Sequence, residues 1–238
     1  MRAGGPGVRV PLFAWLPLVC RVLERSESKV EVISVYWKLS PPTLSMKEST
    51  RVCNALALFQ VMAKNPETRK ELIEAKIPCY FYPFLKPSGD DKPLEYLRLT
   101  SLGVLGALAK FDDPYGPKVL HFFLETEVVP SCLECIDLCD ELSRKVATLI
   151  VMKILMQEKG MSYCSATPER FYSIVQVLYR VVQKLTEKPC LLHLMMTTKR
   201  HGCCRCCISM FMDLYFPLNE DSINYEEYCN AEHNNFKD

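Results

Sequence analysis

The sequence predicts an all-α fold, specifically an armadillo-type α-solenoid, which is a right-handed superhelix of stacked helical repeats. Three stretches carry no charged residue, namely 52–62, 99–109 and 146–152. A helix without a charged side has to be covered by other elements over most of its surface. The stretches recur at a period of about 46 residues, which falls within the roughly 40–47 residues of armadillo and HEAT repeats.

Composition favours a helical, intracellular protein. The 238 residues include nine glycines and no Asn-Gly or Asp-Gly pair, which argues against many hairpins. The formal net charge of +1 gives no overall signal for nucleic acid or membrane. The thirteen cysteines form an odd total, which argues against a disulfide-stapled secreted domain. Cys132, Cys135 and Cys139 share one helical face and are expected in the core rather than at a metal.

Residues 1–29 are expected to be an atypical, partly helical lead-in. Arg2 and Arg9 precede a short apolar run, an arrangement that signal peptides share. Prolines and Arg21 interrupt this run, no small-residue cleavage site follows, and a membrane span would need about 20 apolar residues. We therefore expect a lead-in to the first core helix, with a secretory signal as the alternative.

The first long helix is expected to end near residue 64. An apolar segment at 30–37 precedes it and is stopped by the prolines of Ser40-Pro41-Pro42. Ser45 is expected to cap the helix, with Glu48 completing a capping box. Two short helices are expected after it, one at 66–76 and one at about 79–86.

The next long helix, expected at 93–112, carries the clearest pattern. Gly103 and Gly106 lie in its middle, where each costs about 1 kcal/mol relative to alanine, a cost usually tolerated because something packs very close. The order of two short helices and one long helix then recurs, and the third long helix is expected at 146–157. After a break at 158–168, an amphipathic helix is expected at 169–188. The armadillo domain is thus expected to span 30–200, and 201–238 to form a poorly ordered tail.

Several segments in this order resemble one family: NPETR, EYLRLTSLGVLGALAK, FLETEVVP and ELSRKVATLIVMKIL. It is the Rcd ("required for cell differentiation") family, the armadillo-repeat subunit of the CCR-NOT mRNA deadenylase complex. The resemblance covers roughly residues 32–188 and is lost on either side, as in a divergent or truncated paralogue.

The resemblance implies a non-enzymatic adaptor that recruits regulators of mRNA decay and translation. The implied partners are the large Not scaffold and tryptophan-containing or helical peptide motifs, with weak RNA binding and a homodimer as further options. No cofactor and no membrane are expected. The expected location is the cytoplasm, including mRNA processing bodies, and the nucleus.

The outward side of the long helices is the first candidate for binding. On the central helix, Tyr96, Thr100 and Gly103 share one face, which can serve binding or packing between repeats. The 46-residue register predicts a ladder of Asn54, Thr100 and Val146. The resemblance independently implies a peptide-binding groove at positions that match Tyr96, Gly103 and Val146.

Two further residues enter through the resemblance. Arg170 matches a family arginine beside a tryptophan-accepting pocket, where it can lie over an indole face; the alternative is a solvated arginine at a helix start. Lys145 stands where family members often carry threonine, so the chemistry of the pocket is expected to differ.

Basic residues along the long helices offer an alternative site. They can give the binding face a basic stripe that contacts a phosphate backbone, or they are simply solvated. The candidates are Arg51, Arg98, Arg144 and Lys153, with Lys145 beside them.

No catalytic constellation emerges from the sequence. The four histidines occupy no nucleophile or metal motif, and the crowded cysteines of HGCCRCC, at 201–207, lack a well-spaced second pair for zinc. An adaptor of the deadenylase machinery is therefore the leading prediction. The alternatives are a single-stranded RNA-binding helical-repeat protein and a truncated paralogue with impaired complex assembly.

Overall fold

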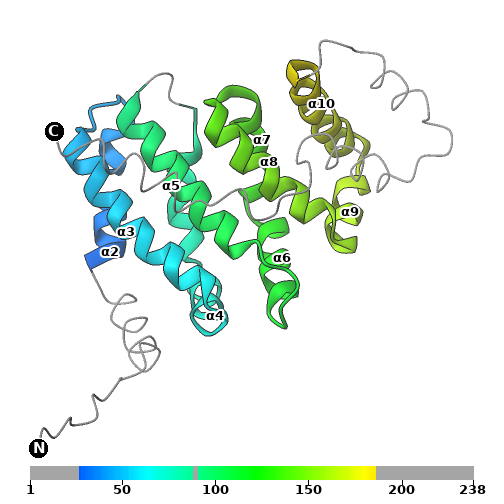
Figure 1. Cartoon of the computed structure of the whole chain (residues 1–238), viewed down its shortest axis with the longest axis horizontal. Coiled ribbons are helices and arrows are strands. Elements are labelled where there is room, and N and C mark those ends of the chain that lie inside the picture. Colours follow the sequence, from blue (N-terminus) through cyan, green and yellow to red (C-terminus); the bar gives the residue numbers. More distant parts are fainter. Residues whose placement is uncertain (1–26, 88–90, 186–238) are drawn as a thin grey trace, which may run out of the picture.

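A computed structural model describes residues 27–87 and 91–185 (Figure 1). Most of the lead-in expected at 1–29 lies outside these residues. The tail at 201–238, its HGCCRCC stretch and the last residues of the expected armadillo domain lie outside them as well.

The described chain is all-α, as predicted. In these two ranges the structure contains helices and a single isolated β-bridge, between Leu39 and Pro42. In chain order the helices are α2 (Glu27–Ser34), η2 (Tyr36–Lys38), α3 (Met46–Lys64), α4 (Pro66–Glu74), η3 (Ile77–Leu85), α5 (Lys92–Leu108), α6 (Gly116–Glu125), α7 (Val128–Leu138), α8 (Glu141–Leu155), α9 (Glu158–Ser165) and α10 (Pro168–Leu185).

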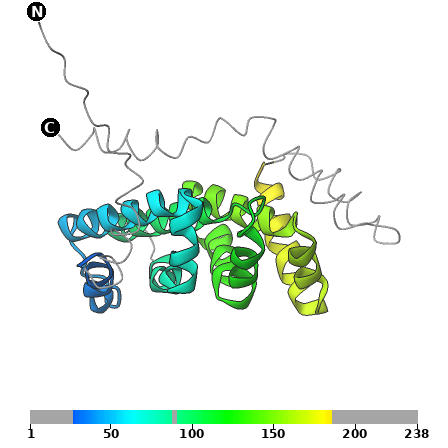
Figure 2. The ribbon, with the colours of Figure 1, turned by 90° about the horizontal axis from the view of Figure 1, so that it is seen from below.

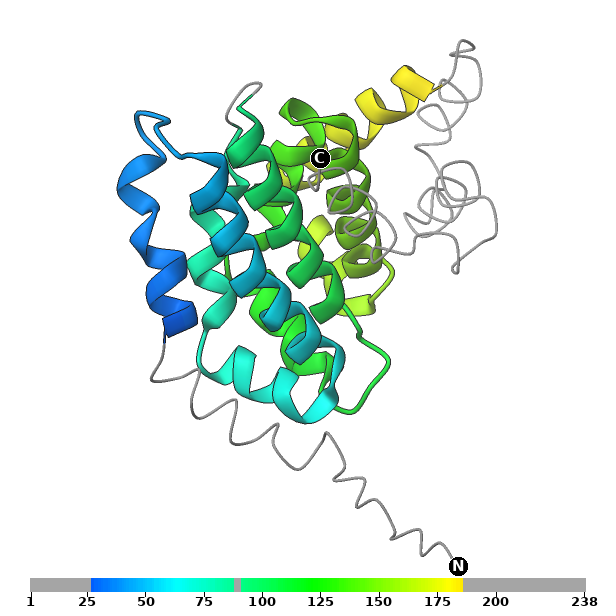
Figure 3. The same ribbon diagram turned by 60° about the vertical axis from the view of Figure 1, so that its left-hand side comes forward.

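The helices form two layers. The long helices α3, α5 and α8 lie side by side in one layer, and the shorter helices line up beneath them (Figures 2 and 3). Within a repeat, two short helices precede the long one, for example α4 and η3 before α5. Each long helix is therefore covered by its own short helices and by the long helices beside it.

Local sequence explains where the helices begin. Ser45 and Glu48 form the predicted capping box of α3, with Glu48 N donating to Ser45 Oγ (3.3 Å) and Ser45 N donating to Glu48 Oε2 (3.1 Å). Hydrogen bonds from Lys38 and Ser45 lower the pKa of Glu48 to about 2. At α4, Asn65 accepts from Glu67 N (3.0 Å), and Pro66 occupies the first turn, where its missing donor costs nothing.

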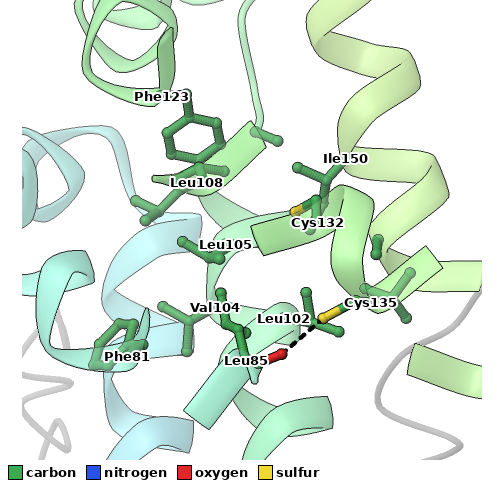
Figure 4. Packing of buried hydrophobic residues seen from close by; sticks show 14 of the residues in the cluster. Phe81, Leu85, Leu102, Val104, Leu105, Leu108, Phe123, Cys132, Cys135 and Ile150 are labelled. Carbon is green, nitrogen blue, oxygen red and sulfur yellow. Dashed lines mark hydrogen bonds between the residues drawn. The ribbon is translucent and has the colours of Figure 1, made fainter. Parts of the chain in front are cut away.

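The core runs between the layers (Figure 4). Cys132 and Cys135 lie in it with no exposed surface, which confirms that they serve as small hydrophobic residues. The Cys135 thiol donates to Leu85 O (3.1 Å). Burial raises the pKa of Cys132 to about 12, so this thiol stays protonated at neutral pH.

The structure corrects two of the predicted elements. Residues 158–168 are not simply a break, because α9 occupies most of them; only Gly160 and Cys164 of this helix are buried, so its sequence has little apolar periodicity. The central helix ends at Leu108 rather than at residue 112, and the chain then turns Phe111 into the core.

Candidate functional site

The candidate site is the outward side of the three long helices, here called the three-helix face. Its members on α3 include Asn54 and Val61. On α5 they are Tyr96, Thr100 and Gly103, and on α8 they are Lys145, Leu149 and Lys153. All of these side chains or backbone positions are exposed or half-buried.

The α5 residues form the centre of this face. Tyr96, Thr100 and Gly103 lie on one side of the helix and are half-buried, as the spacing of four and three predicted. The Thr100 hydroxyl donates to Tyr96 O (2.8 Å) and lies 3.5 Å from Cys53 Sγ on α3. The hydroxyl is thus turned to the backbone and to α3, and the Thr100 methyl group adds to the apolar surface.

No close neighbour requires glycine at either of the two glycine positions of α5, contrary to expectation. A Cβ built on Gly103 would come no nearer than 3.4 Å, to Nε2 of Gln60, and one built on Gly106 would lie 4.0 Å from Ile150 Cγ1. Both are ordinary contacts with side chains. The glycines lower the surface of α5 next to Tyr96, where the Gln60 side chain of α3 lies against Gly103.

An apolar side chain of α3 extends the face on one side. Val61 is 60% exposed, although a helix in an isolated solenoid would be expected to turn polar residues outward here. Leu58 is 53% exposed as well, but it lies about 200° around the helix from Gln60, which packs on Gly103, and so belongs to the side of α3 away from α5. Sequence reasoning missed both residues. The available signal was the uncharged run at 52–62, because an amphipathic helix would have placed charge on its solvent side.

The α8 side of the face carries two lysines, one on each side of an apolar residue. Lys145, Leu149 and Lys153 are spaced by four, and Lys145 pairs with Glu141 (2.7 Å). The face therefore runs from an apolar edge on α3 through a flat centre on α5 to a basic edge on α8.

The predicted ladder of Asn54, Thr100 and Val146 is broken at its third member. Val146 is only 4% exposed, while Asn54 is exposed and Thr100 half-buried. Each helical residue turns by about 100°, so the position after the outward Lys145 points into the packing between helices. Val146 thus shapes the face from beneath and offers no side chain to solvent.

Two of the arginines predicted to contact nucleic acid make hydrogen bonds within the protein. Arg98 is 1% exposed, and its guanidinium donates to Asp140 Oδ2 (3.3 Å) and Lys86 O (3.3 Å). Arg144 donates to Ile136 O (2.9 Å) and Cys139 O (2.9 Å), the last carbonyls of α7. The prediction that Arg98 contacts a phosphate backbone is therefore wrong, because this arginine is buried. Arg144 is half-buried, and its contact with a phosphate backbone stays a prediction.

Arg51 and Lys153 are more accessible to a phosphate backbone than Arg98. Arg51 is exposed and pairs with Glu31 of α2, and Lys153 is half-buried on the outward side of α8. Together with Lys145 they are scattered over two helices. They do not form a continuous stripe across α5.

Arg170 lies away from the other candidates. Its guanidinium stacks over the Tyr163 ring (3.9 Å to the centroid) and donates to Tyr163 O (2.9 Å). α10, which carries Arg170, packs on α7 and α9, whereas Tyr96 and Gly103 lie on α5 (Figure 1). The sequence-predicted residues are thus divided between the three-helix face and a second place at the turn between α9 and α10.

Among the described residues, no three histidine, cysteine or acidic side chains converge in a way that could hold a metal ion. None of the helices in the same ranges is both long and apolar enough to cross a bilayer.

The amino-acid sequence is similar to those of known proteins. Residues 30–201 match the family described as "Cell differentiation family, Rcd1-like". The chain is 49% identical over 157 residues to cell differentiation protein rcd1 of Schizosaccharomyces pombe, covering 66% of this chain and 54% of that protein. It is 47% identical over 156 residues to protein CAF40 of Saccharomyces cerevisiae, covering 66% of this chain and 41% of that protein. The match thus spans about half the length of these curated relatives.

Proposed function

The chain belongs to the Rcd1-like cell differentiation family, and from this premise we propose that it is a non-catalytic adaptor of the CCR-NOT mRNA deadenylase complex. In this role it binds the Not scaffold and short peptide motifs of proteins that regulate mRNA decay and translation. Its place of action is then the cytoplasm, including mRNA processing bodies, and the nucleus.

The observation that carries the proposal is the composition of the three-helix face. Val61 is exposed on the outward side of α3, and on α5 the half-buried Gly103 adds no side chain of its own next to Tyr96. Exposed apolar surface rimmed by polar residues is typical of protein–protein contact sites. A helical peptide with apolar residues spaced three and four apart fits such a surface, because its ridge can approach the backbone at the glycine.

Charge adds a preference to this surface. Lys145 and Lys153 border the face on the α8 side. An acidic residue at one end of the bound peptide would meet them, and complementary charges of this kind mainly increase the association rate and the specificity. The expected ligand is an amphipathic helical peptide with apolar anchors and an acidic flank.

Binding of such a peptide to two face variants tests the proposal. Gly103→Trp fills the flat centre and Tyr96→Asp charges it, so each is expected to weaken binding at least tenfold, about 1.4 kcal/mol. Ser173→Trp and Tyr172→Asp place the same new side chains at exposed positions of α10 and serve as matched controls. If the unchanged chain, the two face variants and the two controls all bind the peptide with equal affinity and have unchanged circular dichroism, the face is ruled out as the peptide site.

Co-purification with the Not scaffold tests complex membership separately. An adaptor is expected to form a stoichiometric complex with the scaffold when the two are co-expressed. A chain that stays alone or aggregates in that experiment would instead be a truncated paralogue with impaired assembly.

Single-stranded RNA binding is the less favoured alternative. Arg98 and Arg144 are engaged with protein groups, which leaves scattered cations and no aromatic platform for stacked bases. Filter binding over a salt series is the test. A steep loss of affinity with salt, weakened by Lys145→Ala and Lys153→Ala together, would revive this alternative.

A further inference from the structure

The side of α2 that faces away from the rest of the described chain is apolar. Val30 is 65% exposed, Ile33 is 39% exposed and Trp37, in η2, is 70% exposed. These three residues, here called the end patch, recur every three to four positions and so form one stripe. On the opposite side of the helix, Val32 and Val35 are buried in the core. α2 is thus apolar on two sides, and the described elements cover only one of them.

α2 occupies the place of a second short helix in its repeat. The Tyr36 hydroxyl, just after α2, donates to Tyr80 O of η3, which is the second short helix of the next repeat. The rings of Tyr36 and Phe84 also meet edge to face, with 5.7 Å between centroids. α2 therefore stacks on η3 as one second short helix on another. It stands at one end of the row of helices (Figure 3).

Among the described helices, each later first short helix packs on the helix that follows it. α4 packs on η3, α6 on α7, and α9 on α10. In each case two residues separate the pair along the chain, for example Ala75 and Lys76 between α4 and η3. The equivalent first element for α2, which begins at Glu27, would therefore end near residue 24.

The sequence at that place has the composition of a first short helix. Residues 17–24 read PLVCRVLE, and Leu18, Val19, Val22 and Leu23 are spaced so that a helix would bring them to one side. The segment begins with proline, as α4 does, and its Val-Leu-Glu ending parallels the Leu-Ile-Glu ending of α4. In α4 the two residues at those apolar positions, Leu72 and Ile73, are buried.

We propose that residues 17–24, here called the lead segment, dock on α2 and cover the end patch. The tether makes this contact local, because three residues of extended chain already reach about 10 Å. The end patch, from Val30 to Trp37, extends about 10 Å along the helix axis, and eight helical residues span about 12 Å. Covering it gives the stack a closed end, which a solenoid needs for solubility. This inference does not depend on the proposed function.

Tryptophan fluorescence of the full chain tests the docking. The chain has two tryptophans, Trp15 and Trp37, so Trp15→Phe leaves Trp37 as the only reporter. We expect its emission to lie at short wavelength and to be protected from acrylamide. Removal of residues 1–26 should shift it to the red and expose it to the quencher. Unchanged emission after removal would overturn the proposal.

Point variants keep the test valid if the shortened chain does not fold. In the Trp15→Phe background, Ile33→Asp in the end patch and Leu18→Asp in the lead segment should each red-shift Trp37. Each should also speed tryptic cleavage after Arg21. Mass spectrometry measures the rate of this cleavage. Leu138→Asp, at a 66% exposed leucine on α7, is the matched control and should do neither.

Two further results would overturn the proposal. One is rapid cleavage after Arg21 in the otherwise unchanged chain, at a rate that Ile33→Asp does not alter. The other is protection of Trp37 that is lost on dilution, because it would identify a second copy of the chain as the cover of the end patch.

Discussion

Arg69 and Asp113, which are 44 residues apart in the chain, form an ion pair between α4 and the turn before α6. Arg69 is 1% exposed, and its guanidinium also donates to Ala63 O (2.8 Å) and Lys64 O (3.3 Å) at the end of α3. One buried cation therefore joins the last turn of a long helix to the short helix that follows and to the next repeat.

Contacts between residues 44 positions apart in the sequence recur along the stack. Ser49 Oγ donates to Pro93 O (2.6 Å), and the Tyr82 hydroxyl donates to Thr126 Oγ1 (2.8 Å), both across 44 residues. In a solenoid each repeat contacts only its neighbours, so tertiary hydrogen bonds cluster near one repeat length. Polar groups thus fix the register between repeats, while the apolar core supplies most of the stability.

Asp113→Asn is expected to destabilise the fold strongly. The amide can still accept from Tyr115 N, as Asp113 Oδ1 does now (3.1 Å), so the change removes mainly the charge that faces Arg69. Removing one partner of a buried pair costs about 3 kcal/mol or more in the free energy of unfolding. Urea denaturation measures this. Asp112→Asn, at the exposed neighbouring position, should stay within about 0.5 kcal/mol, and equal losses in both variants would show that the pair contributes nothing.

The glycines of α5 and α9 should respond to alanine in opposite directions. Gly106→Ala adds a methyl group 4.0 Å from Ile150 and is expected to raise the free energy of unfolding by about 0.5–1 kcal/mol. Gly160→Ala would place its Cβ 1.9 Å from Ile154 O and should cost about 2 kcal/mol or more. Thermal unfolding of the two variants measures both changes in stability. A loss of stability in Gly106→Ala would mean that α5 packs more tightly there than the structure indicates.

Much of the fold could be read from the sequence because each long helix carries a strong local signal. The capping box of Ser45 and Glu48 and the uncharged run at 99–109 are patterns within single helices. α9 gave no such signal, since it buries a glycine and a cysteine against its neighbours instead of an apolar stripe. Its existence is decided by packing on α8, which no local pattern encodes.

The site was harder to predict than the fold. The spacing placed Tyr96, Thr100 and Gly103 on one side of α5, and the structure keeps them together. A fixed period failed at Val146, because α8 begins 49 residues after α5 whereas α5 begins 46 residues after α3. Nor does the sequence distinguish a solvated arginine from Arg98, whose counter-charge comes from Asp140 in a different repeat.

The ion pair of Asp140 with Arg98 predicts a pH dependence. Burial acts to raise the pKa of Asp140, but hydrogen bonds from Ser143 and the charge of Arg98 outweigh it and lower the pKa below its ordinary value. A carboxyl with a lowered folded pKa stabilises the fold above its unfolded pKa, near 4, and loses that effect as the pH falls through the folded value. Asp140→Asn should therefore reduce stability at pH 7 and flatten its decline between about pH 5 and pH 2.

Urea midpoints across this pH range measure the effect. Asparagine remains a good N-cap for α8, where Asp140 Oδ1 accepts from Ser143 N (2.8 Å), so the cap itself should survive. Asp112→Asn again supplies the baseline for an exposed acid. Parallel pH profiles for Asp140→Asn and the unchanged chain would contradict the assigned role of Asp140.

Two separate binding places predict two separable losses, if the proposed adaptor function holds. Gly103→Trp should weaken a tryptophan-free amphipathic helical peptide at least tenfold and leave a tryptophan-containing extended peptide unaffected. Arg170→Ala should do the reverse, because it removes the cation that stacks on Tyr163 and could cover an indole there, an interaction of about 0.5–2 kcal/mol. Arg180→Ala, which removes another α10 arginine that pairs with Asp137 (2.8 Å), is the control for loss of charge on this helix. Isothermal titration of both peptides against the three variants gives the answer. Equal weakening of both peptides by Gly103→Trp and by Arg170→Ala, with unchanged thermal stability, would contradict two independent sites, since changes at distant sites act separately.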